Sequence, residues 1–236
     1  MWNSLINAFK KDNLFQQAFD EACEMLETDG RMFEASVESL RRSDTADIAI
    51  NIKELDKQIN RSERDVRKKV MTHLIVSGGT ELAHGLALVS VVIDIERIGD
   101  YTKNIFDLAR RHPKRLNAGS LESQLKALEE HTSEVFHNTI EAFKNSDENL
   151  ARRVMDDYKE EISADSEKMT DDIIGGEVSD LKSPEASAVV LYSRFLKRIG
   201  SHSRNIATSI VNPFHRIGYN EKTDKSPETD IIPPEE

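Results

Sequence analysis

The chain has 236 residues, of which 32% are charged and 6% aromatic, and its formal net charge is −11. This composition favours long helices with solvated faces over a sandwich or a barrel, and the acidic balance argues against nucleic-acid binding, which needs a basic surface. The single cysteine, Cys23, cannot form an intramolecular disulfide, and no segment has the apolar run of a signal peptide or a membrane span. We therefore expect a soluble cytoplasmic protein.

Three helices are predicted in the first half of the chain. The first spans about 12–44, where apolar residues recur at helical spacing. Ser43 or Asp44 is a suitable cap for the second helix, which stops at the glycine pair 78–79. The third helix ends before Pro113, since proline cannot continue a helix.

The same layout is predicted again in the second half. Ser120 opens a helix, Asp147 opens another that stops at glycines 175–176, and Pro184 suits the first turn of a last helix that ends at 212–213. Short loops favour antiparallel neighbours, so we predict an all-α fold of two tandem three-helix bundles with six long antiparallel helices. The expected division is 1–11 as an amphipathic N-terminal segment, 12–115 as the first repeat, 116–218 as the second repeat and 219–236 as a disordered acidic tail.

Two stretches indicate that the second half duplicates the first. "ERIGDYTKNI" at 96–105 aligns with "KRIGSHSRNI" at 197–206 at an offset of 101 residues. An offset of 103 places 56–66 over 159–169, and apolar residues then meet apolar residues at a seven-residue step. We interpret the chain as a duplicated three-helix unit.

Acidic residues form two facing stripes in the first copy. Glu96 and Asp100 lie one turn apart on one helix, and Asp56, Asn60 and Glu63 form a stripe on the preceding helix. Carboxylates that converge in this way repel one another unless they hold protons or a cation. Oxygen donors suit hard ions such as Mg²⁺, Mn²⁺ or Ca²⁺, and also iron.

The alternative is an ordinary set of surface ion pairs, because Arg97 lies three residues from both Asp94 and Asp100. The second copy favours a shared site. Under the alignment the four acids Asp56, Glu63, Glu96 and Asp100 become Lys159, Ser166, Lys197 and Ser201, whereas Arg-Ile-Gly and the apolar stripe remain. Joint loss of four acids is easier to explain if they serve one function.

Two motifs resemble a known family. "DIERIGDYTKNI" at 94–105 is similar to the signature of the PhoU family, and "DKQINRSE" at 56–63 is similar to the motif on its preceding helix. The resemblance covers about 12–212. It implies a cytoplasmic negative regulator of inorganic phosphate uptake and of phosphate-starvation signalling, without known catalysis. Such proteins act between a phosphate ABC transporter and a sensor histidine kinase, are often homodimers, and bind metal clusters, iron or zinc among them.

The resemblance implies Asp56, Glu63, Glu96 and Asp100 as metal ligands, with Asn60 a weaker member. The ion would be iron, zinc, magnesium or manganese. Because "KRIGSHSRNI" lacks both acids of the second motif, we expect one metal site, in the first half only.

The last helix is locally basic in an acidic protein. Its cationic residues are Arg194, Lys197, Arg198 and Arg204. One hypothesis is a surface for an anion or an acidic partner, and the alternative is a solvated helix face.

Two further features bear on function. The pairs Glu81/His84 and Glu134/His137 have the spacing of a ferritin-like di-iron oxidoreductase, which is the alternative function. The segment 1–11 has one apolar helical face followed by lysines, which suits contact with a membrane or a transporter, or folding back onto the bundle.

Overall fold

The computed structural model describes residues 14–45, 48–79, 81–112 and 114–221. Two expectations from the sequence, the amphipathic segment at 1–11 and nearly all of the acidic tail at 219–236, lie outside these residues. Within the described ranges no strand occurs, and none of the helices combines the length and the apolarity needed to cross a membrane.

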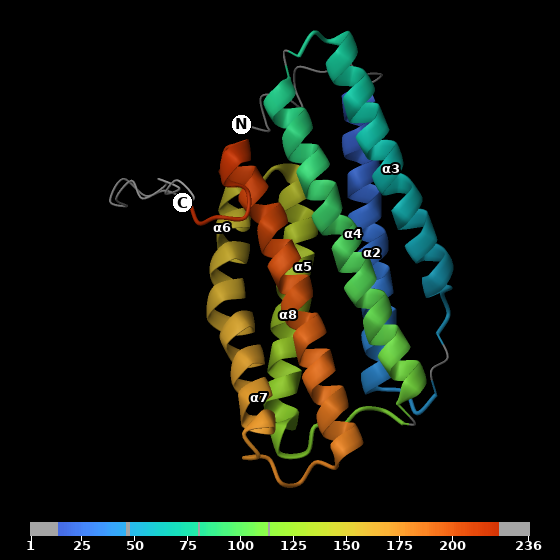
Figure 1. Cartoon of the computed structure of the whole chain (residues 1–236), viewed down its shortest axis with the longest axis vertical. Helices are drawn as coiled ribbons and strands as arrows, with labels where there is room; N and C mark the ends of the chain where they lie inside the picture. The colour runs from blue at the N-terminus through green and yellow to red at the C-terminus, as the bar shows by residue number, and fades with distance from the viewer. Residues whose placement is uncertain (1–13, 46–47, 80, 113, 222–236) are drawn as a thin grey trace, which may run out of the picture.

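The helices of the described residues form two bundles that lie side by side (Figure 1). The first bundle contains α2 (Leu14–Arg41), α3 (Ile52–Val76) and α4 (Leu82–Arg111). The second contains η1 (Gly119–Leu121), α5 (Glu122–Asn145), α6 (Glu148–Asp157), η2 (Tyr158–Ser163), α7 (Ala164–Ile174), α8 (Ser183–Val211) and η3 (Phe214–Arg216). The π-helical η2 joins α6 to α7, so these three act as one rod. The predicted all-α fold of two three-helix bundles is confirmed.

The predicted start of α3 is wrong. The helix begins at Ile52, and its cap is Asn51, whose side chain accepts a hydrogen bond of 3.2 Å from the Glu54 amide. Ser43 instead accepts a 3.1 Å bond from the Thr45 amide, which closes a local turn. Ser43, a residue type that commonly caps helices, therefore stabilises a turn that precedes α3.

Other helix boundaries test the sequence signals in the second bundle. Ser120 lies in η1 rather than capping α5, because its amide and hydroxyl both donate to Asp180, at 2.7 and 2.8 Å. Asp147 caps α6 as predicted and accepts bonds from the amides of Asn149 and Leu150. Pro184 occupies the first turn of α8, also as predicted.

Two pairs of helices join the bundles: α4 packs against α8, and α2 packs against α5. Between α2 and α5 the joint is aromatic, with the rings of Phe19 and Phe143 5.1 Å apart and those of Phe33 and Phe136 6.0 Å apart.

Arg41, at the end of α2, forms a mostly buried ionic link between the bundles. Its Nη2 lies 2.5 Å from Glu122 and its Nε 3.0 Å from Glu129, both on α5. The Tyr192 hydroxyl on α8 donates a 2.8 Å bond to the same Glu129. Because the pair is largely shielded from water, removing one member would leave a buried charge without its partner.

The joint between α4 and α8 is polar and aromatic. Asp94 Oδ1 lies 2.7 Å from His202 Nδ1 and accepts a 3.0 Å bond from the Asn205 amide group. The Tyr101 ring stacks on the His202 ring, with their centroids 5.7 Å apart, and the Phe195 ring lies 6.2 Å from the Tyr101 ring. The face of α4 turned towards the second bundle is thus fixed by several contacts.

The duplication inferred from the sequence is visible in the helices. α4 and α8 begin at Leu82 and Ser183, which are equivalent at the 101-residue offset. Gly99 and Gly200 are both buried at equivalent points of these helices. A mid-helix glycine costs about 1 kcal/mol relative to alanine, so a close approach of neighbouring groups accounts for both.

Candidate metal centre

The four predicted acids lie close together on the adjoining faces of α3 and α4. The side chains of Asp56, Glu63 and Glu96 are 14%, 13% and 14% exposed, and that of Asp100 is 31% exposed. Lys103 Nζ lies 3.5 Å from Asp56 and 4.0 Å from Asp100, and so bridges the two helices. The antiparallel pairing of α3 and α4 therefore brings two sequence-distant motifs into one group of carboxylates.

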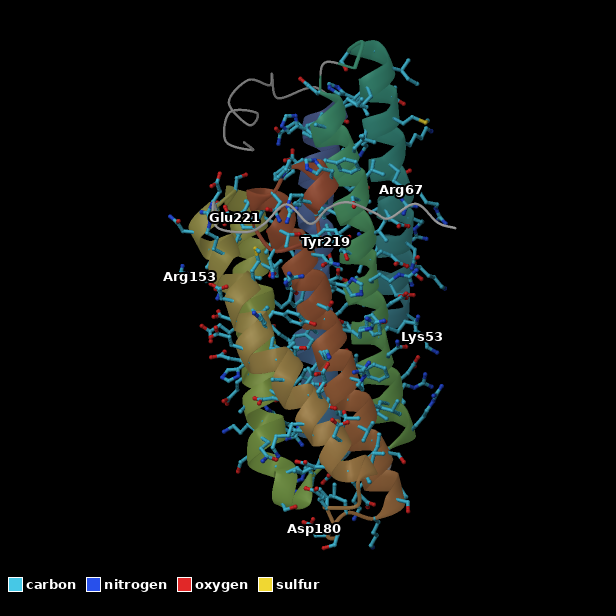
Figure 2. The ribbon with its side chains drawn as sticks, turned by 60° about the vertical axis from the view of Figure 1, so that its left-hand side comes forward. Lys53, Arg67, Arg153, Asp180, Tyr219 and Glu221 are labelled. Carbon is cyan, nitrogen blue, oxygen red and sulfur yellow. The ribbon has the colours of Figure 1, made fainter. Side chains whose placement is uncertain are left out.

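Cationic side chains border this group. Arg97 Nη1 lies 3.1 Å from Asp100 and its Nε 3.7 Å from Glu96, and Arg67 Nη2 lies 2.7 Å from Glu63. In Figure 2, Arg67 and Lys53 mark the line of α3 along the edge of the first bundle. The ion pairs expected from the sequence alternative are therefore present, although Asp94 pairs with α8 and not with Arg97.

The side chain of Asn60, the fifth predicted member, contacts its own helix. Its side-chain amide donates a 2.9 Å bond to the Asp56 carbonyl one turn earlier on α3. The amide nitrogen is thus engaged by its own helix, and a role of Asn60 in metal binding stays a prediction.

The pKa values of the central acids are raised. Burial is the main cause for Glu96, and the negative charges of Asp100, Glu63 and Asp56 add to it. Burial is also the main cause for Asp56, where Lys103 acts in the opposite direction and Asp100 raises the pKa further. A carboxylate that is short of water and near other negative charges gains from a nearby positive charge.

A fifth acid, Asp29 of α2, lies beneath this group. It is 0% exposed, and neither of its carboxylate oxygens has a hydrogen-bond partner. Burial raises its pKa well above the usual range, and the charges of Glu96, Asp56 and Asp100 raise it further. A Cβ on Gly99 would lie 2.7 Å from Asp29 Oδ1, so the carboxylate touches α4 between Glu96 and Asp100.

Sequence reasoning missed Asp29, because an acid among the buried positions of a helix gives no periodic signal. The duplication contained the missing signal. The 103-residue offset that aligns α3 with its copy also places Asp29 over Thr132. Thr132 is buried and satisfies its hydroxyl within α5, with a 2.7 Å bond to the Leu128 carbonyl. Five acids of the first copy, and not four, are therefore replaced together in the second.

In the second bundle, uncharged side chains lie around the equivalent glycine, Gly200. A Cβ on Gly200 would meet Tyr158 at 3.0 Å and Ile162 at 3.1 Å. Ser166 is buried and donates a 3.0 Å bond to the Ser193 carbonyl, and Lys197 pairs with Glu167. The second bundle thus packs an aromatic and an aliphatic side chain against its glycine.

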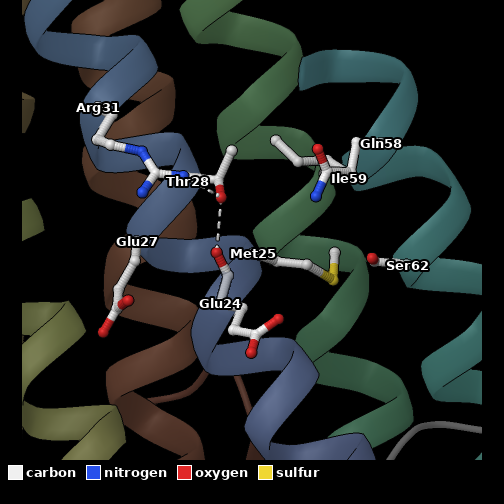
Figure 3. Close-up of a pocket in the computed structure, with 8 residues that line it drawn as sticks. All are labelled: Glu24, Met25, Glu27, Thr28, Arg31, Gln58, Ile59 and Ser62. Carbon is white, nitrogen blue, oxygen red and sulfur yellow. Dashed lines mark hydrogen bonds between the residues drawn. The ribbon is translucent and has the colours of Figure 1, made fainter. Parts of the chain in front are cut away.

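A pocket of about 220 Å³ opens between α2 and α3 (Figure 3). Its polar side chains include Glu24, Glu27 and Arg31, and Arg31 donates a 3.0 Å bond to the Thr28 hydroxyl. Ile59 lines the pocket and would also lie 3.4 Å from a Cβ on Gly99. None of the five acids lines this pocket, so it is a separate feature.

The carboxylate oxygens of the acid group are suitable ligands for a hard cation, although their side chains are not arranged around a common point. Among the described residues, no three Asp, Glu, His or Cys side chains are arranged as a complete ligand set. The outer carboxylates face Arg67, Arg97 and Lys103 instead. The cationic members of these pairs are partly exposed to solvent, so a divalent ion could take their place beside the carboxylates. The two oxygens of Asp29 have no hydrogen-bond partner, and a cation could contact both.

Three of the four basic residues predicted as a surface on α8 contact other residues of the chain, and one of them, Lys197, pairs with Glu167. Arg204 donates to the Gly218 carbonyl at 3.0 Å and to the Asn220 side chain at 2.6 Å. The Arg198 guanidinium lies 5.9 Å over the Tyr101 ring, while Arg194 is exposed. An anion-binding surface on this helix stays a prediction.

The two Glu-x-x-His pairs do not form a common centre. Glu81 lies 2.5 Å from His73 near the turn between α3 and α4, whereas Glu134 and His137 are exposed on α5. A ferritin-like site needs both pairs to project into the core of one bundle, and this structure does not place them there.

Comparison with known proteins agrees with the duplicated architecture. The family model described as "PhoU domain" matches residues 22–109 and again 125–210. A "phosphate-specific transport system accessory protein PhoU homolog" from Pseudomonas putida is 25% identical over 170 residues, which cover 70% of this chain and 65% of that protein. The chain therefore aligns with slightly less than two thirds of that relative's length. A homologue of the same description from Pseudomonas aeruginosa is 24% identical over 170 residues, 70% of this chain and 69% of its own.

Solved structures show the same fold. The crystal structure of PhoU from Pseudomonas aeruginosa superposes with a TM-score of 0.75 at 19% identity, covering 86% of this chain and 97% of that one. PhoU from Streptococcus pneumoniae gives a TM-score of 0.58 at 18% identity, covering 84% and 88%. Because the family model matches each of the two bundles, the chain belongs to the PhoU family.

Proposed function

We propose that this protein is a cytoplasmic accessory protein of a phosphate transport system, which represses phosphate uptake and phosphate-starvation signalling through contact with partner proteins. Support comes from the match of both bundles to the PhoU domain and from relatives described as phosphate-specific transport system accessory proteins. The proposed partners are a phosphate ABC transporter, a sensor histidine kinase, or both, with the protein acting as a homodimer.

We further propose that the first bundle holds a metal ion. The observation that carries this proposal is the group of partly buried carboxylates on α3 and α4, with the partnerless Asp29 beneath it. Asp56, Glu63, Glu96 and Asp100 would bind the ion. Oxygen ligands of this kind favour magnesium, manganese or iron over a softer metal. Neutralising the carboxylates would also hold α3 against α4, which gives the ion a structural role.

Elemental analysis of the purified protein tests the metal proposal. We expect stoichiometric metal in the wild type and its loss in Glu96→Ala/Asp100→Ala. Lys197→Ala/Ser201→Ala is the matched control, because these residues occupy the equivalent positions of the second bundle. Equal metal in all three proteins, or none in wild type supplied with manganese and iron, would refute the metal site.

Deletion of the gene in its native host tests the regulatory proposal. We expect higher phosphate uptake and higher expression of phosphate-starvation genes in phosphate-rich medium. Complementation with wild type should restore repression, and complementation with Glu96→Ala/Asp100→Ala shows whether repression needs the acids. Unchanged uptake and expression in the deletion strain would contradict the proposal.

A further inference from the structure

We propose that Asp29 is the innermost ligand of a cation position enclosed by α2, α3 and α4. The ion would then lie within the first bundle, and not on the outer faces of α3 and α4 alone. This inference rests on the proposed metal binding, but it assigns a ligand from a third helix, and it can fail while metal binding by the outer acids stands.

The first argument is the burial of Asp29. Aspartate is almost never fully buried unless it is paired, yet Asp29 is 0% exposed and both of its oxygens are without a hydrogen-bond partner. The neighbouring hydroxyl of Thr28 does not help, since it donates to the Glu24 carbonyl at 2.8 Å (Figure 3). Burying a carboxylate without a partner is strongly unfavourable. A bound cation is a natural partner for both oxygens.

The second argument is the position of Gly99. A Cβ at this residue would lie 2.7 Å from Asp29 Oδ1, which is closer than real Cβ atoms approach an oxygen. Gly99 stands three residues after Glu96 and directly before Asp100. The absence of a side chain at Gly99 therefore lets the Asp29 carboxylate of α2 approach the backbone of α4 between Glu96 and Asp100.

The third argument is the second bundle, which serves as an internal comparison. There the glycine is retained as Gly200, but Tyr158 and Ile162 pack against it and Thr132 replaces the buried acid. Helix packing alone explains Gly200. Among the described residues, the first bundle alone combines this glycine with a buried carboxylate and with acids on the two neighbouring helices. The buried carboxylate therefore occurs together with the acid group, and the fold by itself does not require it.

The class of ligand follows from the donors. All five side chains supply carboxylate oxygens, and hard divalent cations prefer such oxygens. Mn²⁺ alone is a suitable probe, because it shares this preference and its bound form has a distinct electron paramagnetic resonance spectrum.

The experiment compares Mn²⁺ binding by wild type, Asp29→Asn, Glu96→Gln and Asp20→Asn. Asparagine keeps the shape of aspartate but removes its charge, and Asp20 is an exposed acid on the same helix. We expect Asp20→Asn to bind as wild type does, and both Asp29→Asn and Glu96→Gln to bind at least about tenfold more weakly. The rise in melting temperature caused by Mn²⁺ should be lost in Asp29→Asn.

A merely structural role for Asp29 predicts a different pattern. Metal-free Asp29→Asn would then melt below wild type, whereas a ligand without its metal predicts melting at or above wild type near neutral pH. Wild-type affinity in Asp29→Asn together with loss of binding in Glu96→Gln would overturn the inference and leave the outer metal site standing. No Mn²⁺ binding by wild type would overturn both.

A second variant covers the case in which Asp29→Asn does not fold. Gly99→Ala places a methyl group against the Asp29 carboxylate, and Gly200→Ala makes the same change in the second bundle. We expect Mn²⁺ binding to weaken in Gly99→Ala and to persist in Gly200→Ala. Equal, wild-type-like binding by both variants would overturn the inference.

Discussion

The clearest consequence of Asp29 is a pH-dependent cost to the stability of the metal-free protein. Burial and the nearby charges of Glu96, Asp56 and Asp100 raise its pKa well above the usual value. The folded state therefore holds the Asp29 proton more tightly than the unfolded state does, and folding takes up a proton when the pH lies between the two pKa values. The contribution of Asp29 to stability is then fully present below the pKa of the unfolded state, and it is lost as the pH rises towards the raised pKa.

The magnitude follows from proton linkage. Each pH unit between the pKa of the unfolded state, about 3.9, and the raised pKa lowers the free energy of unfolding by about 1.4 kcal/mol. This slope is an upper bound, and it is reached only at pH values that lie well between the two pKa values. In a chain of this size, 1 kcal/mol shifts the melting temperature by about 2–4 °C.

The assay is a set of urea and thermal unfolding curves in chelator, for wild type and Asp29→Asn, at about pH 5, 6 and 7. Acids far from Asp29 titrate alike in both proteins, so the difference between the two curves reports Asp29 together with its coupling to Glu96, Asp56 and Asp100. We expect Asp29→Asn to gain stability relative to wild type as the pH rises, and Asp20→Asn to follow wild type. Parallel curves for wild type and Asp29→Asn would show that Asp29 titrates alike in both states and would refute the argument.

Three other residues give independent predictions. Arg41→Ala should lower the free energy of unfolding by about 3–5 kcal/mol in urea, because it leaves Glu129 buried beside Tyr192 without its cation; a loss below 1 kcal/mol would contradict a buried link. Asn51→Ala should cost about 1 kcal/mol in the same assay by removing the α3 cap, and an unchanged midpoint would count against that cap. Burial raises the pKa of Cys23 to about 12, so we expect slow reaction with a thiol reagent near neutral pH and fast reaction in denaturant; equal rates would mean an accessible thiolate.

Much of the fold was predictable from local signals. The helix starts with Asp147 and Pro184 rest on hydrogen bonding and backbone angles within a few residues, and both predictions are confirmed. The start of α3 was not predictable in this way. Ser43 is a suitable capping residue, but a local turn engages its hydroxyl and Asn51 caps the helix instead. Ser120 was similarly engaged by Asp180, a residue sixty positions away.

In the candidate site, too, the residues that follow from local spacing were predictable and the residue that depends on tertiary packing was not. The stripes of Asp56 with Glu63 and of Glu96 with Asp100 follow from helical spacing, and antiparallel packing brings them together. Whether α2 contributes a ligand depends on which of its residues lies against Gly99. The spacing of residues within α2 does not predict that this residue is Asp29. The duplication was the best substitute for a structure, since it marks Asp29 as one more acid without a counterpart in the second half.

The helix α4 connects the acid group of the first bundle to the contact with α8 of the second bundle. On one side α4 carries Glu96 and Asp100, and on the other it carries Asp94 and Tyr101, which contact His202 of α8. These four residues lie within two turns of a single helix, so if the proposed ion shifts α4 on binding, α8 would have to accommodate that shift as well. Among the described residues, the positions of the second bundle equivalent to the four predicted acids carry lysine or serine, so a change at α8 would be a response to the proposed ion of the first bundle.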